Sequence, residues 1–153
     1  MKKKLAIGLT AVAVLIFIIV GVATCSGSEQ TGTAMSFKEV HSQGAVHMLV
    51  LTSPSRQEIN ATDLANRLKK DWQNKLQYDN AVMVQVFDSE DAALQWAYLE
   101  FDPQALLLSD EEWDKINDPL WPHLIADYSR NKTSGLNEVN IWSEGNLVQK
   151  IKF

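Results

Sequence analysis

Three histidines are the side chains of this sequence best suited to hold a metal ion, and His41 and His47 are the closest pair. A catalytic zinc takes three protein ligands, so this pair together with His123 would supply a suitable donor set. A spacing of six residues along one strand, however, separates two side chains by about 20 Å, too far for them to share an ion. We therefore expect no metal site.

Nucleophilic catalysis has little support in the sequence. The single cysteine, Cys25, ends an apolar segment, so the remainder of the chain has neither a thiol nucleophile nor a disulfide. No Gly-x-Ser-x-Gly turn is present. Acidic residues gather at 88–91 and 110–118, where a turn and a helix N-terminus account for them. We expect no catalytic residue and no cofactor, although a small hydrolase stays open because distant residues can assemble a triad.

A polar segment at 129–135 is a candidate ligand-binding loop. It places Arg130 and Lys132 beside hydroxyl groups and Gly135 in an otherwise acidic chain. Backbone N–H groups and an arginine in such a loop can bind an anion. The alternative is a hairpin loop, because the same residue types favour turns.

Two of the five tryptophans are candidates for binding a partner. Trp142 alternates with Val139 and Ile141, so it should lie on the face of its strand opposite the core. Trp121 stands between a proline and a predicted strand, and exposed aromatic side chains often anchor partners. A second layer of packing would bury both side chains equally well.

The amino terminus predicts attachment to a membrane. Residues 5–25 carry no charge and are long enough to span a bilayer as a helix, and residues 2–4 are all lysine. By the positive-inside rule these lysines keep the amino terminus cytoplasmic. The end of the segment also resembles a bacterial lipoprotein signal peptide, in which Cys25 would be lipidated. Both anchors place a flexible tether at 26–36 and a domain at 37–153 on the outer side of the membrane.

Charge excludes one class of partner. The chain after Cys25 has 11 basic and 19 acidic residues, a net charge of −8. Nucleic acid binding requires clustered Lys and Arg, so we expect no nucleic acid partner. An envelope protein is the expected partner.

Hydrophobic patterns predict an α+β fold. Leu64, Leu68, Trp72 and Leu76 recur every four residues on an amphipathic helix at 61–77, capped by Asn60. A capping box, Ser109 with Glu112, starts a short helix that ends before residue 118. Strands are predicted at 45–52, 81–87, 94–101, 123–129, 138–143 and 147–153, with a hairpin turn at 144–146. The order β-α-β-β-α-β-β-β favours a mainly antiparallel sheet with one long helix packed on one face.

Part of the sequence resembles a family of small uncharacterised bacterial domains. The resemblance covers residues 45–142 and is carried by the helix after a Thr-Ser-Pro-Ser strand end, the Trp-Ala-Tyr-Leu-Glu-Phe-Asp-Pro run and a later Ile-Trp strand. It supports the fold and implies no activity. We expect a membrane-tethered, non-enzymatic binding module of the cell envelope, with a small envelope hydrolase and an inhibitor or immunity-type protein as the alternatives.

Overall fold

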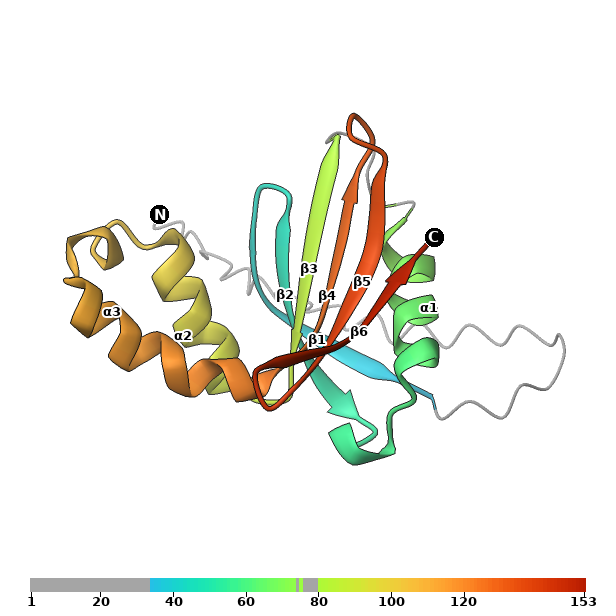
Figure 1. The fold of residues 1–153 in the computed structure, drawn as a ribbon, viewed down its shortest axis with the longest axis horizontal. Helices are drawn as coiled ribbons and strands as arrows, with labels where there is room; N and C mark the ends of the chain where they lie inside the picture. The colour runs from blue at the N-terminus through green and yellow to red at the C-terminus, as the bar shows by residue number, and fades with distance from the viewer. Residues whose placement is uncertain (1–33, 74, 76–79) are drawn as a thin grey trace, which may run out of the picture. The chain divides into compact units, whose positions relative to one another are not determined.

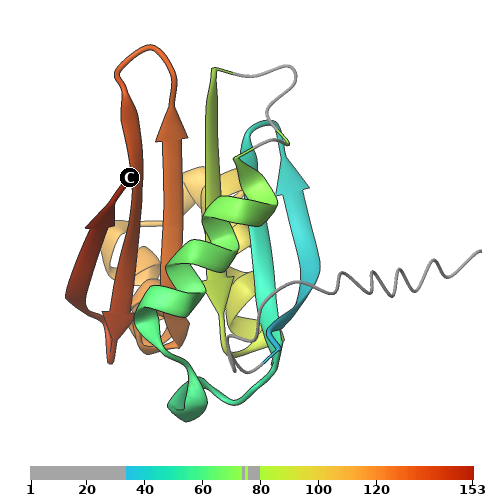
Figure 2. The same ribbon diagram turned by 90° about the vertical axis from the view of Figure 1, so that its right-hand side faces the viewer.

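A computed structural model describes residues 34–73, 75 and 80–153. Within them lies one six-stranded sheet in the order β1-β2-β3-β4-β5-β6, with helix α1 on one face and helices α2 and α3 on the other (Figures 1 and 2). The strands are β1 Ser36–Gln43, β2 Val46–Ser53, β3 Ala81–Phe87, β4 Leu124–Asn131, β5 Leu136–Ser143 and β6 Asn146–Lys152. The helices are α1 Ala61–Trp72, α2 Glu90–Phe101 and α3 Asp110–Asn117, with short 3-10 turns η1 Arg56–Glu58, η2 Ala105–Leu107 and η3 Asp118–His123.

The predicted membrane anchor, residues 5–25, lies outside the described residues, as do Cys25 and residues 26–33 of the predicted tether. Among the residues that are described, no helix is long and apolar enough to cross a membrane. The predicted α+β class with a mainly antiparallel sheet is confirmed: only β2 and β3 pair in parallel, and all other neighbours are antiparallel.

Strand β1 was not among the predicted strands. It pairs with β2 in a hairpin whose turn contains Gly44 at a φ of +58°, a conformation that glycine adopts without strain. A bulge between Glu39 and His41 breaks the register of the pairing. The bulge interrupts the two-residue alternation of side chains, and most of the strand is exposed, so β1 lacks the sequence pattern of a half-buried strand.

Helix α1 connects the two parallel strands, β2 and β3, which cannot be joined by a tight turn. Its predicted cap is confirmed, because the Asn60 side chain accepts hydrogen bonds from the backbone N–H groups of Thr62 (2.9 Å) and Asp63 (3.2 Å). The helix ends at Trp72, earlier than the predicted end at residue 77.

The prediction of a strand at 94–101 was wrong, because this segment belongs to helix α2. The Ser89 hydroxyl caps the helix by accepting from the backbone N–H of Ala92. Trp96 and Ala97 are neighbours in sequence and both are buried, which a strand with one covered face does not allow. The helical signal therefore begins at Ser89, ahead of the aromatic residues that suggested a strand.

Helix α3 begins with the predicted capping box, in which the Ser109 N–H donates to Glu112 Oε2 (2.9 Å) and the Glu112 N–H donates to Ser109 Oγ (3.3 Å). Together, α2 and α3 overturn the prediction that one helix packs on one face. The observed order of strands and α-helices is β-β-α-β-α-α-β-β-β, and both faces of the sheet carry a core.

The predicted terminal meander is confirmed. Strands β5 and β6 are joined by a two-residue turn at Glu144 (φ +51°) and Gly145 (φ +74°), as type I′ hairpins require. A Cβ at position 145 would lie 3.3 Å from the Trp121 Cβ, so glycine also permits a close approach to the second core.

Candidate binding site

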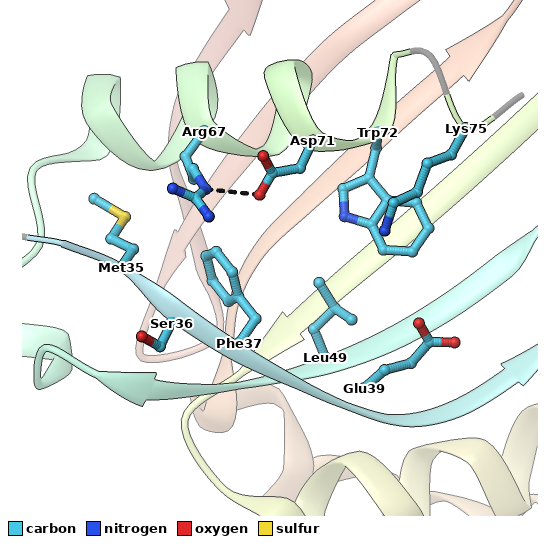
Figure 3. Close-up of a pocket in the computed structure, with 9 residues that line it drawn as sticks. All are labelled: Met35, Ser36, Phe37, Glu39, Leu49, Arg67, Asp71, Trp72 and Lys75. Carbon is cyan, nitrogen blue, oxygen red and sulfur yellow. Dashed lines mark hydrogen bonds and ion pairs between the residues drawn. The ribbon is translucent and has the colours of Figure 1, made fainter. Parts of the chain in front are cut away.

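A hollow among the described residues lies between helix α1 and strand β1. We call it the α1–β1 cleft; its volume is about 550 Å³, it is open to solvent, and Figure 3 shows the side chains that line it. Helix α1 packs mainly on β4, β5 and β6 and less on β1 and β2, so the cleft lies toward the β1 edge of the sheet. The residues that line the cleft are Met35, Ser36, Phe37, Glu39, Leu49, Arg67, Asp71, Trp72 and Lys75.

The floor of the cleft is apolar. Leu49 and Trp72 are only 3% and 4% exposed, so they form a packed base and present little ring surface to a ligand. Phe37 is half-buried, and Figure 3 shows its ring pointing from β1 toward α1. A ligand side chain that entered the cleft would contact these groups from above.

The rim of the cleft carries charges of both signs. Arg67 Nε lies 2.6 Å from Asp71 Oδ2, one helical turn away (Figure 3). The Lys75 ammonium group lies 3.9 Å from the centroid of the Trp72 ring, a cation–π geometry. Within the described part of the chain, Lys75 has no carboxylate partner, so it is the cation left for a ligand.

Glu39 on β1 closes the rim opposite the helix. Its Oε1 lies 3.3 Å from His47 Nδ1, and the His47 ring packs against Trp72 with centroids 4.4 Å apart. The aromatic floor and the acidic rim therefore meet at this histidine.

Strand β1 forms one edge of the six-stranded sheet. An edge strand leaves half of its backbone N–H and C=O groups unpaired within its own sheet, and these groups can hydrogen-bond an added strand. The cleft lies beside such an edge, with pockets for side chains above it. This combination suits an extended peptide, which would combine backbone pairing with side-chain contacts.

The tryptophans singled out from sequence come together on the other face of the sheet. The Trp121 ring lies 5.6 Å from that of Trp142 and 4.9 Å from that of Trp96, the latter pair edge to face. Both Trp121 and Trp142 are partly buried in the second core, beside α2. Partner binding by these two residues stays a prediction.

A partly buried polar cluster includes the Trp142 side chain. The Trp142 Nε1–H donates to Asp127 Oδ2 (2.6 Å) and the Asn140 Nδ2–H donates to Asp127 Oδ1 (2.9 Å). Burial raises the pKa of the Asp127 carboxyl, in opposition to these two hydrogen bonds, which lower it. Gln85 Oε1 and Asn140 Oδ1 are buried with no hydrogen-bond partner among the described residues.

Arg130 and Lys132 do not line the α1–β1 cleft. Arg130 belongs to β4, and its guanidinium donates to the Gln73 carbonyl just after helix α1. The Lys132 backbone N–H donates to the Asn80 carbonyl. Asn131 Oδ1 accepts from the N–H groups of residues 133 and 134, so turn chemistry accounts for the loop. Anion or partner binding by Arg130 and Lys132 stays a prediction.

The histidines do not converge. The chain reverses at Gly44, so the estimated separation of His41 and His47 along a single strand does not apply. The two rings instead lie on opposite faces, against Phe101 and Trp72 respectively. No group of three or more His, Cys, Asp or Glu side chains among the described residues has a geometry that could hold a metal ion.

His123 pairs with a carboxylate at the edge of the second core. Its Nδ1 lies 2.8 Å from Asp88 Oδ1, while Arg56 lies 3.0 Å from Asp88 Oδ2 and also donates to the Pro122 and Trp142 carbonyls. No hydroxyl group of the described residues is hydrogen-bonded to His123. These contacts connect four segments of the chain: η1, the residue after β3, η3 and β5. We therefore interpret the cluster as structural.

Sequence reasoning missed most of the cleft. Arg67 and Asp71 were not singled out as candidate site residues, and Phe37 and Glu39 lie on a strand that the pattern did not reveal. A usable signal was the i, i+4 spacing of Arg67 and Asp71 on the helix that also carries Trp72. Comparison with models of protein families, with curated proteins and with solved structures finds no match to this chain.

Proposed function

We propose that this chain is a non-enzymatic binding module of the bacterial cell envelope that takes an extended segment of another envelope protein into the α1–β1 cleft. Residues 5–25, or a lipid on Cys25, would hold the module on the outer side of a membrane. The observation that carries the proposal is the position of the cleft between a helix and an edge strand.

The edge strand supports recognition of backbone. A peptide lying beside β1 would add a seventh strand and pair its N–H and C=O groups with those of the sheet. The other edge, β6, is exposed and carries a smaller hollow of about 380 Å³ beside Lys152 and Phe153, and no described residue of α1 lines that hollow. We therefore assign binding to β1.

The cleft lining supports recognition of side chains. Its apolar floor at Phe37, Leu49 and Trp72 fits one or two apolar side chains of a peptide. Lys75 would pair with a peptide carboxylate, because Arg67 is already paired with Asp71. We expect a preference for segments in which an acidic residue accompanies apolar ones.

A display selection tests the proposal. The full chain, purified from membranes in detergent, is used to select from a library of phage-displayed random peptides, and the binding of selected peptides is measured by fluorescence polarisation. Lys75→Glu should weaken binding about tenfold, because it replaces an attractive charge with a repulsive one. Lys70→Glu is the matched control: Lys70 is exposed on helix α1, shortly before Lys75 in the chain, does not line the cleft, and its substitution should leave binding unchanged.

Hydrogen exchange separates strand addition from side-chain binding alone. A bound peptide that extends the sheet should slow amide exchange in β1 and leave β6 unchanged. Failure to select any peptide, or equal effects of the two lysine substitutions, would contradict the proposed site. Binding without protection of β1 would limit the cleft to side-chain recognition.

The anchor has a test of its own. Intact mass is measured for the chain extracted from membranes, as wild type and as Cys25→Ala. Loss of residues 1–24 with the gain of acyl chains in the wild type alone identifies a lipoprotein. A full-length mass in both identifies a transmembrane helix, and a soluble chain without an anchor contradicts the proposed location.

A further inference from the structure

The layer formed by α2, η2 and α3 differs from the rest of the domain in charge. Residues 90–118 contain nine acidic residues and one lysine, a net charge of −8. This equals the net charge of the whole chain after Cys25, so the remainder is balanced. Asp110, Glu111 and Asp114 are all exposed on α3.

An apolar pair projects from this acidic layer. Leu106 and Leu107, in η2, are each 84% exposed, the highest values among the large apolar side chains of the described residues. Figure 1 shows the connection between α2 and α3 at the end of the layer farthest from the sheet. Trp113 on α3 is a further exposed aromatic side chain, at 37%. Adjoining exposed apolar side chains with polar residues around them are typical of an interaction surface.

The leucine pair is held outward by the fold. Ala105 is buried, and Leu108 packs against the second core, so residues 105 and 108 anchor one side of the 3-10 turn. Backbone hydrogen bonds from Leu107 to the Gln104 carbonyl and from Leu108 to the Ala105 carbonyl fix the turn. A preformed projection loses little conformational entropy when it binds.

We propose that Leu106 and Leu107 dock into an apolar pocket with a basic rim on a second envelope protein. The acidic residues around the pair would meet the basic rim and steer the encounter. A bilayer fits less well, because bacterial membranes carry anionic lipids that repel a layer of net charge −8. This surface is distinct from the α1–β1 cleft and does not depend on it.

The experiment uses a photo-crosslinking amino acid in place of Leu106 in the full chain, in cells that produce it. Val148 on β6, which is 59% exposed and apolar, is the control position. The protein captured from position 106 is identified by mass spectrometry, purified, and tested for binding to the wild-type chain and to variants.

The docking proposal requires three results with that purified protein. Leu107→Asp should weaken binding at least tenfold, whereas Val148→Asp and Lys75→Glu should not. The double substitution Glu111→Gln with Asp114→Asn should weaken binding several-fold and reduce its dependence on salt.

Four outcomes would overturn the proposal. They are equal capture from positions 106 and 148, no capture from position 106, a crosslink to a second copy of this chain, and unaltered binding by Leu107→Asp. Vesicles of phosphatidylethanolamine and phosphatidylglycerol test whether the surface binds a membrane. In one outcome, the wild-type chain sediments with these vesicles while Leu107→Asp does not. That result would assign Leu106 and Leu107 to membrane binding and would contradict docking to a protein.

Discussion

Helices α1 and α2 have the same length, yet only α1 was recognised from its sequence. Helix α1 has one stripe of buried residues and polar residues elsewhere, because one side of it faces solvent. Helix α2 buries residues over a wider arc, since it lies between the sheet, α3 and η3. The comparison teaches that the helical period is visible in a sequence where the apolar residues form one narrow stripe and polar residues occupy the rest of the helix.

The largest expected effect tests whether the two cores form one unit. Leu68 in the first core and Phe87 in the second are both 0% exposed. We expect Leu68→Ala to lower the free energy of unfolding by about 2–5 kcal/mol and Phe87→Ala by about 3–5 kcal/mol, in a single transition. Urea denaturation followed by circular dichroism measures both. Separate transitions for the two variants would show that the layers unfold independently.

The partly buried Asp127 makes the stability of the protein depend on pH. Because burial raises the pKa of this carboxyl in the folded state, the folded protein holds the proton more tightly than the unfolded chain. Stability should therefore fall as pH rises from the ordinary pKa of aspartate through the raised value. Asp127→Asn should remove this decline and be at least as stable as the wild type at pH 7.

Denaturant titrations across pH 3–8 measure the effect of Asp127→Asn. Asp114→Asn, at an exposed position, is the control and should leave the pH profile unchanged. An Asp127→Asn protein that is clearly less stable at pH 7 would mean that the hydrogen bonds from Trp142 and Asn140 to the carboxylate outweigh its desolvation.

The helix caps allow a direct comparison of α1 with α2. Asn60 accepts two backbone hydrogen bonds at the start of α1, and Ser89 accepts one at the start of α2. Replacement by Ala should cost about 0.5–2 kcal/mol at each position, with the larger loss for Asn60→Ala. The same urea titrations decide the order, and a larger loss for Ser89→Ala would show that α2 depends more on its cap than on packing.

The smallest effect concerns the rim of the cleft. Arg67→Gln removes the ion pair with Asp71 and should change stability by only about 0.3–0.5 kcal/mol, since both partners lie at the surface. A loss above about 1.5 kcal/mol would show that the rim also holds α1 against the sheet.

The elements that the sequence predicted share a local signal. Each of these elements is indicated by a few neighbouring residues. The structure contains all three of them: the Asn60 cap, the capping box at Ser109 and the Glu144–Gly145 turn. Strand β1 and helix α2 were missed because their patterns depend on a bulge and on burial from several sides.

The candidate cleft could not be predicted for a different reason. It joins Phe37 and Glu39 of β1 to Arg67 and Lys75 at α1, and only the tertiary arrangement brings these residues together. For Trp142, in contrast, the sequence predicted the correct face of the strand but not what covers that face. Alternation placed Trp142 on the face opposite Val139, as observed, but could not reveal that α2 covers that face.

Strand β3 has consequences for how the domain folds. Its two partners, β2 and β4, are both distant in sequence, whereas β1 pairs with β2 and β4 to β6 pair in order through short turns. Forming the two local units costs little chain entropy, but placing β3 between them closes two long loops. We expect the hairpin and the meander to form early and the insertion of β3 to limit the rate of folding.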